Sequence, residues 1–453
     1  MNVDFLLTTD LSKRLYHECA RNLPIIDYHN HLAISDIADN RVFENIAQLW
    51  IISDPYKHRA MRILGVAEKY ITGDSSDFEK FEAWYKSLPR LIGNPLFDWS
   101  QMELATVFNF ELLPFGDAQS VWNELNRRLE NMTAKDVLSK FNIEYSAPCA
   151  ALTDDLSAFD KSCGICPSLR GDDLLLPSNE LINKLSLLSK KEITSLSDYL
   201  DAIDTRLSEF EAAGMYFADH ALDNGFSYIS DDGRNSERFS LLLATKLPED
   251  AKTALRSYIL KAVMSLYAKH GFTVQLHIGA QRTTSTRIRT LAGVAGGYAA
   301  IGSTVDVSSV VTLLDSVEKE TFGLPNVLLF TLNPADNAVF ATLSGSYSKD
   351  GCEAFVSQGP AWWWCDHYEG IYNMLSTFST HSVLSSFVGM TTDSRSPLSF
   401  VRHDYFRRVL CEWISDMVSK GRLPNDFSLL TDTVARICYK NAKRIIGGNK
   451  NAF

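Results

Sequence analysis

The sequence lacks the features of a secreted or membrane protein. No stretch approaches the roughly 18 consecutive apolar residues of a membrane span. Residues 1–22 carry acidic residues early and show no basic region leading into an apolar run, so no signal peptide is predicted. The eight cysteines are scattered through 453 residues, unlike the disulfide framework of a small secreted domain. We therefore expect a cytoplasmic protein that binds no membrane.

The chain is also short of basic residues. Lys and Arg total 44 against 55 Asp and Glu, which gives a net charge of −11. Because nucleic-acid-binding proteins normally present a basic face, this balance predicts no nucleic-acid partner. The same charge repels anions at long range, so an anionic substrate would need its own local arginines.

Eight short apolar runs are present, and each ends in polar residues. They cover residues 24–31, 143–155, 164–170, 214–220, 272–280, 326–333, 353–359 and 386–395. Several are almost continuously apolar, as expected of parallel strands covered on both faces. Helical patterns such as 196–214 and 248–271 separate many of the runs. This alternation predicts an α/β fold, a (β/α)8 barrel of the TIM type.

The first two runs are too far apart for a simple crossover. More than 100 residues separate them, whereas a strand–helix–strand connection needs only a few tens. We therefore predict that residues 1–35 and 141–453 form the barrel and that 36–140 form a mostly helical insertion over the active-site mouth. The segments 78–91 and 117–132 have the pattern of amphipathic helices within it.

The first run, PIIDYHNH, suggests a metal site. His29 and His31 are two residues apart, so on a strand their side chains point the same way. Two imidazoles rarely complete a site, and Asp393, after the last run, is our choice of third ligand. Such a set suits one divalent ion: zinc is our first choice, with manganese, cobalt or iron(II) as alternatives. A hydrogen-bonded pair of structural histidines is the competing interpretation.

Several long motifs resemble those of uronate isomerases. They are IIDYHNHL, LWIISDPYKHRAMRILGVAEKYITGD, GMYFADHALD, VQLHIGAQRTTSTR and FVGMTTDSRSPLSFVRHDYFRR. The resemblance covers nearly the whole chain. Uronate isomerases are divergent barrels of the amidohydrolase superfamily that interconvert hexuronates and their keto forms. The resemblance therefore implies an aldose–ketose isomerase acting on D-glucuronate/D-fructuronate and D-galacturonate/D-tagaturonate.

The resemblance also implies catalytic roles. His29, His31 and Asp393 look like the family's metal ligands. Asp393, alone or through a metal-held hydroxyl, would take the C2 proton. The enediol that results would then be protonated at C1. Tyr56 matches the tyrosine that polarises the carbonyl, and Arg395 would help to stabilise the developing charge.

Further residues are implied in substrate binding. Arg170 and Arg395 look like the arginines that hold the acidic substrate, through the planar geometry that suits carboxylates. His277, in the QLHIG segment, would line the site. Trp363, within the run Trp362–Trp364, is a candidate sugar-facing aromatic, although core packing is about equally plausible for two of the three.

Two positions depart from the family pattern. Pro55 stands where a histidine usually precedes the tyrosine, which removes a potential proton carrier beside Tyr56. Asn30 stands between the two histidines, where cysteine is common.

Alternatives remain open from the residues themselves. A mononuclear metal-dependent hydrolase, a deaminase or lactonase, would use the same ligands, and a non-catalytic binding protein is a third class. Asp219 and His220 could extend the site, but a polar layer of the barrel is slightly favoured. Asp154 and Asp155 are expected to be turn or cap residues. For Arg402 and His403, a solvated helix start and a substrate contact are equally plausible. The protein is expected to bind a small hexuronate and could form a homo-oligomer.

Overall fold

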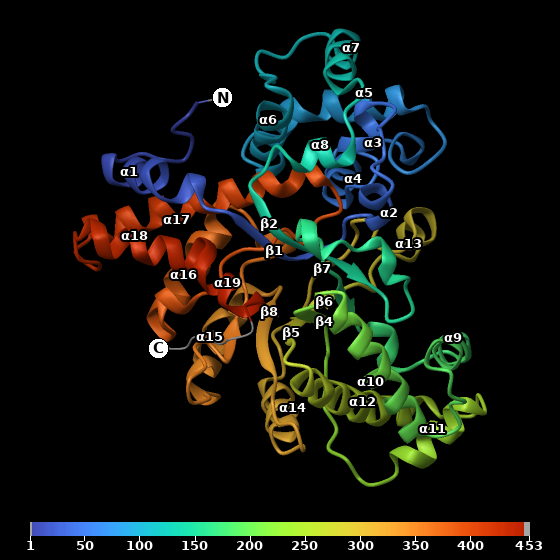
Figure 1. Ribbon diagram of the computed structural model, residues 1–453. Coiled ribbons are helices and arrows are strands. Elements are labelled where there is room, and N and C mark those ends of the chain that lie inside the picture. Colours follow the sequence, from blue (N-terminus) through green and yellow to red (C-terminus); the bar gives the residue numbers. More distant parts are fainter. Residues whose placement is uncertain (1, 448–453) are drawn as a thin grey trace.

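The computed structural model describes residues 2–447, which adopt an α/β fold around a curled parallel sheet (Figure 1). Its seven strands follow the order β1 (Ile25–Asn30), β2 (Ile143–Ala150), β3 (Ser168–Arg170), β4 (Phe217–Leu222), β5 (Thr273–Ile278), β8 (Asn326–Thr331) and β9 (Val356–Gln358). All of these neighbours pair in parallel. Seven of the predicted strands are thus confirmed, and their carboxyl ends share one edge of the sheet.

The eighth predicted strand is wrong, because residues 387–394 form no strand. Gly389 and Asp393 have φ values of 83° and 45°, left-handed conformations that interrupt an extended chain. The segment nevertheless lies beside β1. The Asp393 amide donates to the His29 carbonyl at 3.0 Å, and the His31 amide donates to the Ser394 carbonyl at 2.8 Å. Asp393 is therefore held against the carboxyl end of β1.

Helices connect the later strands and cover the sheet. They are α9 (Asn179–Ser189), α10 (Leu196–Ala212), α11 (Asn235–Leu243), α12 (Glu249–Lys269), α14 (Val307–Glu318), α15 (Asn337–Ser346), α16 (Tyr368–His381) and α17 (Val401–Ser419). The predicted helices at 196–214 and 248–271 are confirmed. A capping box between Ser195 and Asp198 fixes the start of α10 by satisfying free backbone amides.

The long segment between β1 and β2 is mostly helical. It contains α2 (Ile34–Ala38), α3 (Ile46–Trp50), α4 (Pro55–Ile63), α5 (Asp77–Ser87), α6 (Pro95–Phe108), α7 (Ala118–Leu129) and α8 (Ala134–Leu138). The two predicted amphipathic segments correspond to α5 and α7. Helix α4 begins where Asp54 accepts hydrogen bonds from the amides of Tyr56 and Lys57. Pro55 occupies the first helical position, where its missing N–H costs nothing.

The helices α3–α8 share a hydrophobic core with the C-terminal helices. One buried cluster runs from residues of α3–α8 to residues of α16, α17 and α18 (Phe427–Ala435). A second cluster lies between the sheet and the helices α9–α12, α14 and α15. The remaining helices are α1 (Asp10–Glu18), α13 (Thr286–Ala292) and α19 (Asn441–Ile446). Within residues 2–447, no helix combines the length and apolar character needed to cross a membrane.

A buried histidine on α4 predicts a pH-dependent stability. Burial lowers the pKa of His58 from 6.5 to about 4. The unfolded chain therefore binds the extra proton below about pH 6.5, and stability is lost as the pH falls toward 4. Between about pH 7.5 and pH 5 we expect this histidine to cost about 2 kcal/mol of unfolding free energy.

Urea denaturation at these two pH values measures the effect. His58→Gln should reduce the pH dependence by that amount, whereas His381→Gln, which removes an exposed histidine at the end of α16, serves as the control. An unchanged pH dependence in His58→Gln would contradict the expectation.

Candidate active site

A cavity of about 260 Å³ lies at the carboxyl edge of the sheet. All eight residues predicted for the site line it: His29, His31, Tyr56, Arg170, His277, Trp363, Asp393 and Arg395. The rest of its wall comes from Pro55, Arg282, residues 294–299, Trp362 and Trp364. Residues from β1, α4, β3, β5 and the 387–394 segment thus meet in one place.

His29, His31 and Asp393 form a compact group. Nε2 of His29 and Nε2 of His31 lie 3.2 and 3.0 Å from the same Asp393 oxygen, Oδ1. Burial disfavours the Asp393 carboxylate, but the two histidines outweigh it and hold its pKa well below the usual range. Oδ2 of Asp393 is buried and has no hydrogen-bond partner among the described residues. This oxygen is free to contact a ligand.

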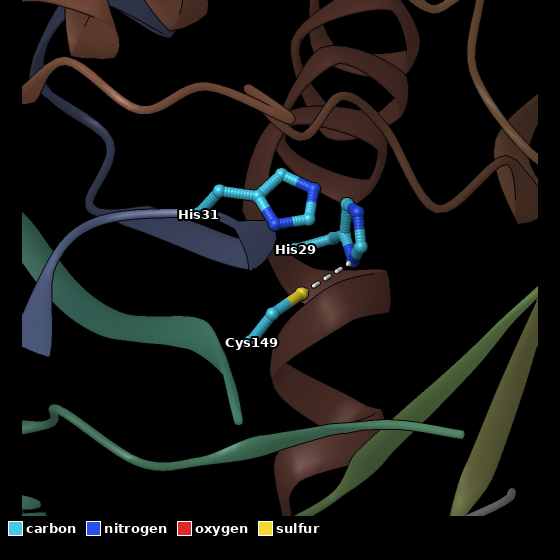
Figure 2. Close-up of side chains that lie close together, drawn as sticks. All are labelled: His29, His31 and Cys149. Atoms are coloured by element: carbon cyan, nitrogen blue, oxygen red, sulfur yellow. Dashed lines mark hydrogen bonds between the residues drawn. The ribbon is translucent and has the colours of Figure 1, made fainter. Parts of the chain in front are cut away.

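Two groups of residues around His29 could hold a metal ion, and neither includes Asp393. The ligand atoms of His29, His31 and Cys149 lie within 4.8 Å of one another, as do those of His29, Asp219 and His277. Figure 2 shows the two histidines and Cys149 close together, with the Cys149 sulfur 3.7 Å from His29 Nδ1. Imidazole, thiol and carboxylate are all donors for divalent transition metals.

Cys149 was not among the predicted site residues, because the predicted second strand extends beyond the observed one. Strand β2 ends at Ala150, so Cys149, and not the later aspartates, stands at its carboxyl end. Asp154 accepts a hydrogen bond from the Ala151 amide, and Asp155 caps a short 3-10 helix. These two aspartates are turn and cap residues.

Asp219 belongs to the site, and its neighbour does not. Its fully buried carboxylate is 3.2 Å from Arg170 Nη1 and 3.8 Å from His277 Nδ1. Burial raises the pKa of Asp219 above its ordinary value. Since adjacent residues of a strand face opposite sides, His220 points away, and its Nε2 lies 3.0 Å from the Tyr267 hydroxyl.

The arginines of the cavity differ in how far they are neutralised. Arg170 pairs with Asp172 at 2.9 Å as well as with Asp219. Arg282, which sequence reasoning did not single out, pairs with Asp223 and stacks 4.7 Å from the centre of the Trp363 ring. Arg395 is exposed and makes no side-chain ion pair within residues 2–447. It is therefore the cavity arginine most available to an anionic ligand.

The Tyr56 hydroxyl is buried against a cation. Its oxygen makes no hydrogen bond of normal geometry with the described residues, and burial raises the pKa of Tyr56 far above its ordinary value. The Arg402 guanidinium lies 5.3 Å from the centre of the Tyr56 ring and forms a buried ion pair with Asp366. The phenol is therefore neutral and has a proton to donate. Of the two interpretations of Arg402, the solvated helix start is therefore wrong, because the side chain is buried.

His277 is a neutral, deeply buried imidazole. Burial, reinforced by the charge on His29, holds the pKa of His277 well below its usual range. Its two ring nitrogens have no hydrogen-bond partner among the described residues. The ring lies 4.7 Å from that of Trp362, which is buried, while Trp363 is only partly buried. Trp362 is thus mainly a core residue.

Comparisons with known proteins agree with this arrangement. The family model described as glucuronate isomerase matches residues 1–446. The chain is 37% identical to a uronate isomerase of Bacillus pumilus, over 98% of this chain and 96% of the relative. It is also 37% identical to a uronate isomerase of Caldicellulosiruptor saccharolyticus, over 99% of both.

A solved structure supports the same conclusion. The crystal structure of a uronate isomerase from Thermotoga maritima superposes with a TM-score of 0.90 at 26% identity and covers 98% of this chain and 99% of that one. The resemblance noted in the motifs is therefore confirmed over the whole chain. These matches show that the chain belongs to the uronate isomerase family, a family of aldose–ketose isomerases.

Proposed function

We propose that the protein interconverts D-glucuronate with D-fructuronate and D-galacturonate with D-tagaturonate by moving a proton between C2 and C1. One observation carries this proposal. The unpartnered oxygen of Asp393, the neutral hydroxyl of Tyr56 and the unpaired guanidinium of Arg395 line the same small cavity. A base, a proton donor and an anion-binding group are what this reaction requires.

The proposed metal ligands are His29, His31 and Asp393. They would hold one divalent ion, for which zinc is the first choice. The Nε2 atoms of His29 and His31 and the Asp393 Oδ1 atom beside them are suitable donors for such an ion. When bound, the ion would act as a Lewis acid and would orient the uronate through its carboxylate and a neighbouring hydroxyl.

Proton transfer is assigned to residues of the chain. The α-proton at C2 is weakly acidic, so Asp393 takes it as a base and the enediol forms. The Tyr56 hydroxyl donates a hydrogen bond to the C1 oxygen and so stabilises the charge that develops there, with help from Arg395. Asp393 then returns the proton to C1, while the proton of the C2 hydroxyl passes to the C1 oxygen and the C2 carbonyl forms. Because Pro55 replaces the usual histidine, Tyr56 is the only residue of α4 assigned to stabilising the C1 oxygen.

Substrate binding is assigned to four residues. Arg395 binds the carboxylate, and Arg170 supports it from the other side while it stays paired with Asp219. His277 and Trp363 contact the sugar with their rings. Because the protein carries a net charge of −11, these guanidinium groups must supply the local attraction for an anion.

The finer architecture is also proposed. Residues 387–394 take the place of an eighth strand and complete the (β/α)8-type barrel predicted for residues 1–35 and 141–453. Residue 1 and residues 448–453 of that prediction lie outside the described residues. Residues 36–140 are an insertion whose helix α4 delivers Tyr56 to the cavity. Location in the cytoplasm and assembly into a homo-oligomer remain predictions from the sequence.

Substrate conversion tests the proposal directly. The purified protein, supplied with zinc, manganese or cobalt, is incubated separately with D-glucuronate and D-galacturonate, and the keto acids are quantified by chromatography. Formation of either keto acid is expected. If neither forms with any of the three metals, the proposed reaction is wrong.

Removal of the Arg395 charge should weaken binding of the uronate. For Arg395→Met we expect KM for the uronate to rise about 10- to 100-fold, because a charge-assisted hydrogen bond to a carboxylate is lost. Arg422→Met, at an exposed position outside the cavity, is the matched control. An unchanged KM in Arg395→Met would assign the carboxylate to another arginine.

A further inference from the structure

The two nitrogens of the His29 ring face different partners. Nε2 lies 3.2 Å from Asp393 Oδ1. Nδ1 lies 3.7 Å from the Cys149 sulfur and 4.0 Å from Asp219 Oδ1 (Figure 2). One ring does not bind the same ion through both nitrogens. The Nδ1 edge therefore needs its own explanation.

The Cys149 sulfur stands between this edge and Asp219. It lies 3.7 Å from His29 Nδ1 and also 3.7 Å from Asp219 Oδ1, with the thiol as donor to the carboxylate. A thiol is both a weak donor and a weak acceptor. It can therefore accept a hydrogen bond from His29 Nδ1–H while it donates one to Asp219. The other oxygen of Asp219 accepts from Arg170 Nη1 at 3.2 Å. The contacts form a continuous chain from His29 to Arg170.

We propose that Cys149 is a positioning residue that bridges His29 to Asp219. It keeps the ring proton of His29 on Nδ1, so that Nε2 stays free to hold the metal beside Asp393. Through Asp219 the same bridge reaches Arg170, so it links the metal-holding His29 to an arginine assigned to the substrate carboxylate. This inference rests on the metal site of the proposed function and adds a residue to it.

Direct binding of the metal by the thiolate is the competing arrangement. Ligand atoms at about 2.1 and 2.3 Å from a tetrahedral ion lie about 3.6 Å apart, close to the sulfur–nitrogen separation observed here. That arrangement would use His29 Nδ1, so the ion would lie beside Cys149 and not at His29 Nε2 and Asp393, where His31 also converges. The bridge keeps the ion in the group of His29, His31 and Asp393, so it fits the proposed ligand set.

Cobalt(II) binding separates the two arrangements. Affinity for Co²⁺ alone is measured by chelator competition in the wild type and in Cys149→Ala and Cys149→Ser. We expect a loss of about 10- to 100-fold in Cys149→Ala, the usual effect of removing a group that orients a metal ligand. Cys149→Ser keeps a donor and an acceptor and should lose less. Cys411→Ala, a buried cysteine of α17 outside the cavity, is the matched control for packing.

The Co²⁺ spectrum supplies a readout independent of activity. The wild type should show no sulfur-to-cobalt charge-transfer band in the near ultraviolet, while its visible d–d bands should shift in Cys149→Ala. A double-mutant cycle with Asp219→Asn should be non-additive, since both substitutions break the same chain of contacts.

Two results would overturn the bridge. One is a Cys149→Ala variant with wild-type Co²⁺ affinity and spectrum. The other is a strong sulfur-to-cobalt band in the wild type that disappears in Cys149→Ser, which would make Cys149 a ligand. A wild type that binds Co²⁺ as expected but converts no uronate would overturn the proposed function and leave the bridge standing.

Discussion

Asp393→Asn should nearly abolish isomerisation. The substitution keeps the size of the side chain and one oxygen donor, but it removes the base that takes the C2 proton. General-base catalysis contributes about 10²- to 10⁴-fold, so we expect kcat to fall by at least about 10³-fold, or about 4 kcal/mol of activation free energy. The rate of keto-acid formation measures this effect.

The effect must be separated from loss of fold or of metal. Thermal unfolding and metal content of Asp393→Asn are compared with those of Asp39→Asn, a substitution at an exposed aspartate. The assay is run at saturating metal, so that weaker metal binding is compensated. A kcat within about tenfold of the wild type would place the base elsewhere, for example on the neutral imidazole of His277.

Removal of the metal should inactivate the enzyme reversibly. After chelation and gel filtration we expect activity to fall by more than about 100-fold, since the substrate loses both its anchor and its Lewis acid. Zinc, and to differing extents manganese or cobalt, should restore it at one ion per chain. Elemental analysis together with the assay measures stoichiometry and recovery.

Substitution of one proposed metal ligand tests whether the metal acts at this site. His31→Asn should bind metal more weakly and should need far more of it to recover activity, because one of the two imidazoles that meet at Asp393 is lost. His381→Asn, at the exposed end of α16, should recover like the wild type. Full activity of the metal-free protein would contradict the proposed site.

Much of the fold was predictable, because buried parallel strands have a simple sequence pattern. Strands such as β5 and β8 pair along their whole length, from Thr273 with Asn326 to Ile278 with Thr331, and they appear as nearly unbroken apolar runs. The segment 386–395 begins with a similar but shorter apolar run, Phe387–Met390. Its left-handed residues Gly389 and Asp393 turn the chain out of a strand, and composition does not reveal a backbone angle.

The candidate site was predictable where it depends on strand ends. His29 and His31 stand at the end of β1, so their spacing alone brought them together. Cys149 was missed through an error of five residues in the end of β2. Tyr56 lies on helix α4 and not at the end of a strand, so only the resemblance to a family indicated it. The buried pair of Arg402 with Asp366 depends on packing between distant segments, which no local pattern reports.

The most direct test of the account follows hydrogen transfer itself. The protein is incubated with D-glucuronate in D2O, and the product is examined by proton NMR. We predict D-fructuronate with deuterium at C1, because Asp393 exchanges its proton with solvent between removal at C2 and return to C1. Fructuronate without deuterium would contradict transfer by an exchanging base and would indicate a hydride shift or a shielded base. No change in the sugar, with metal supplied, would contradict the isomerase function.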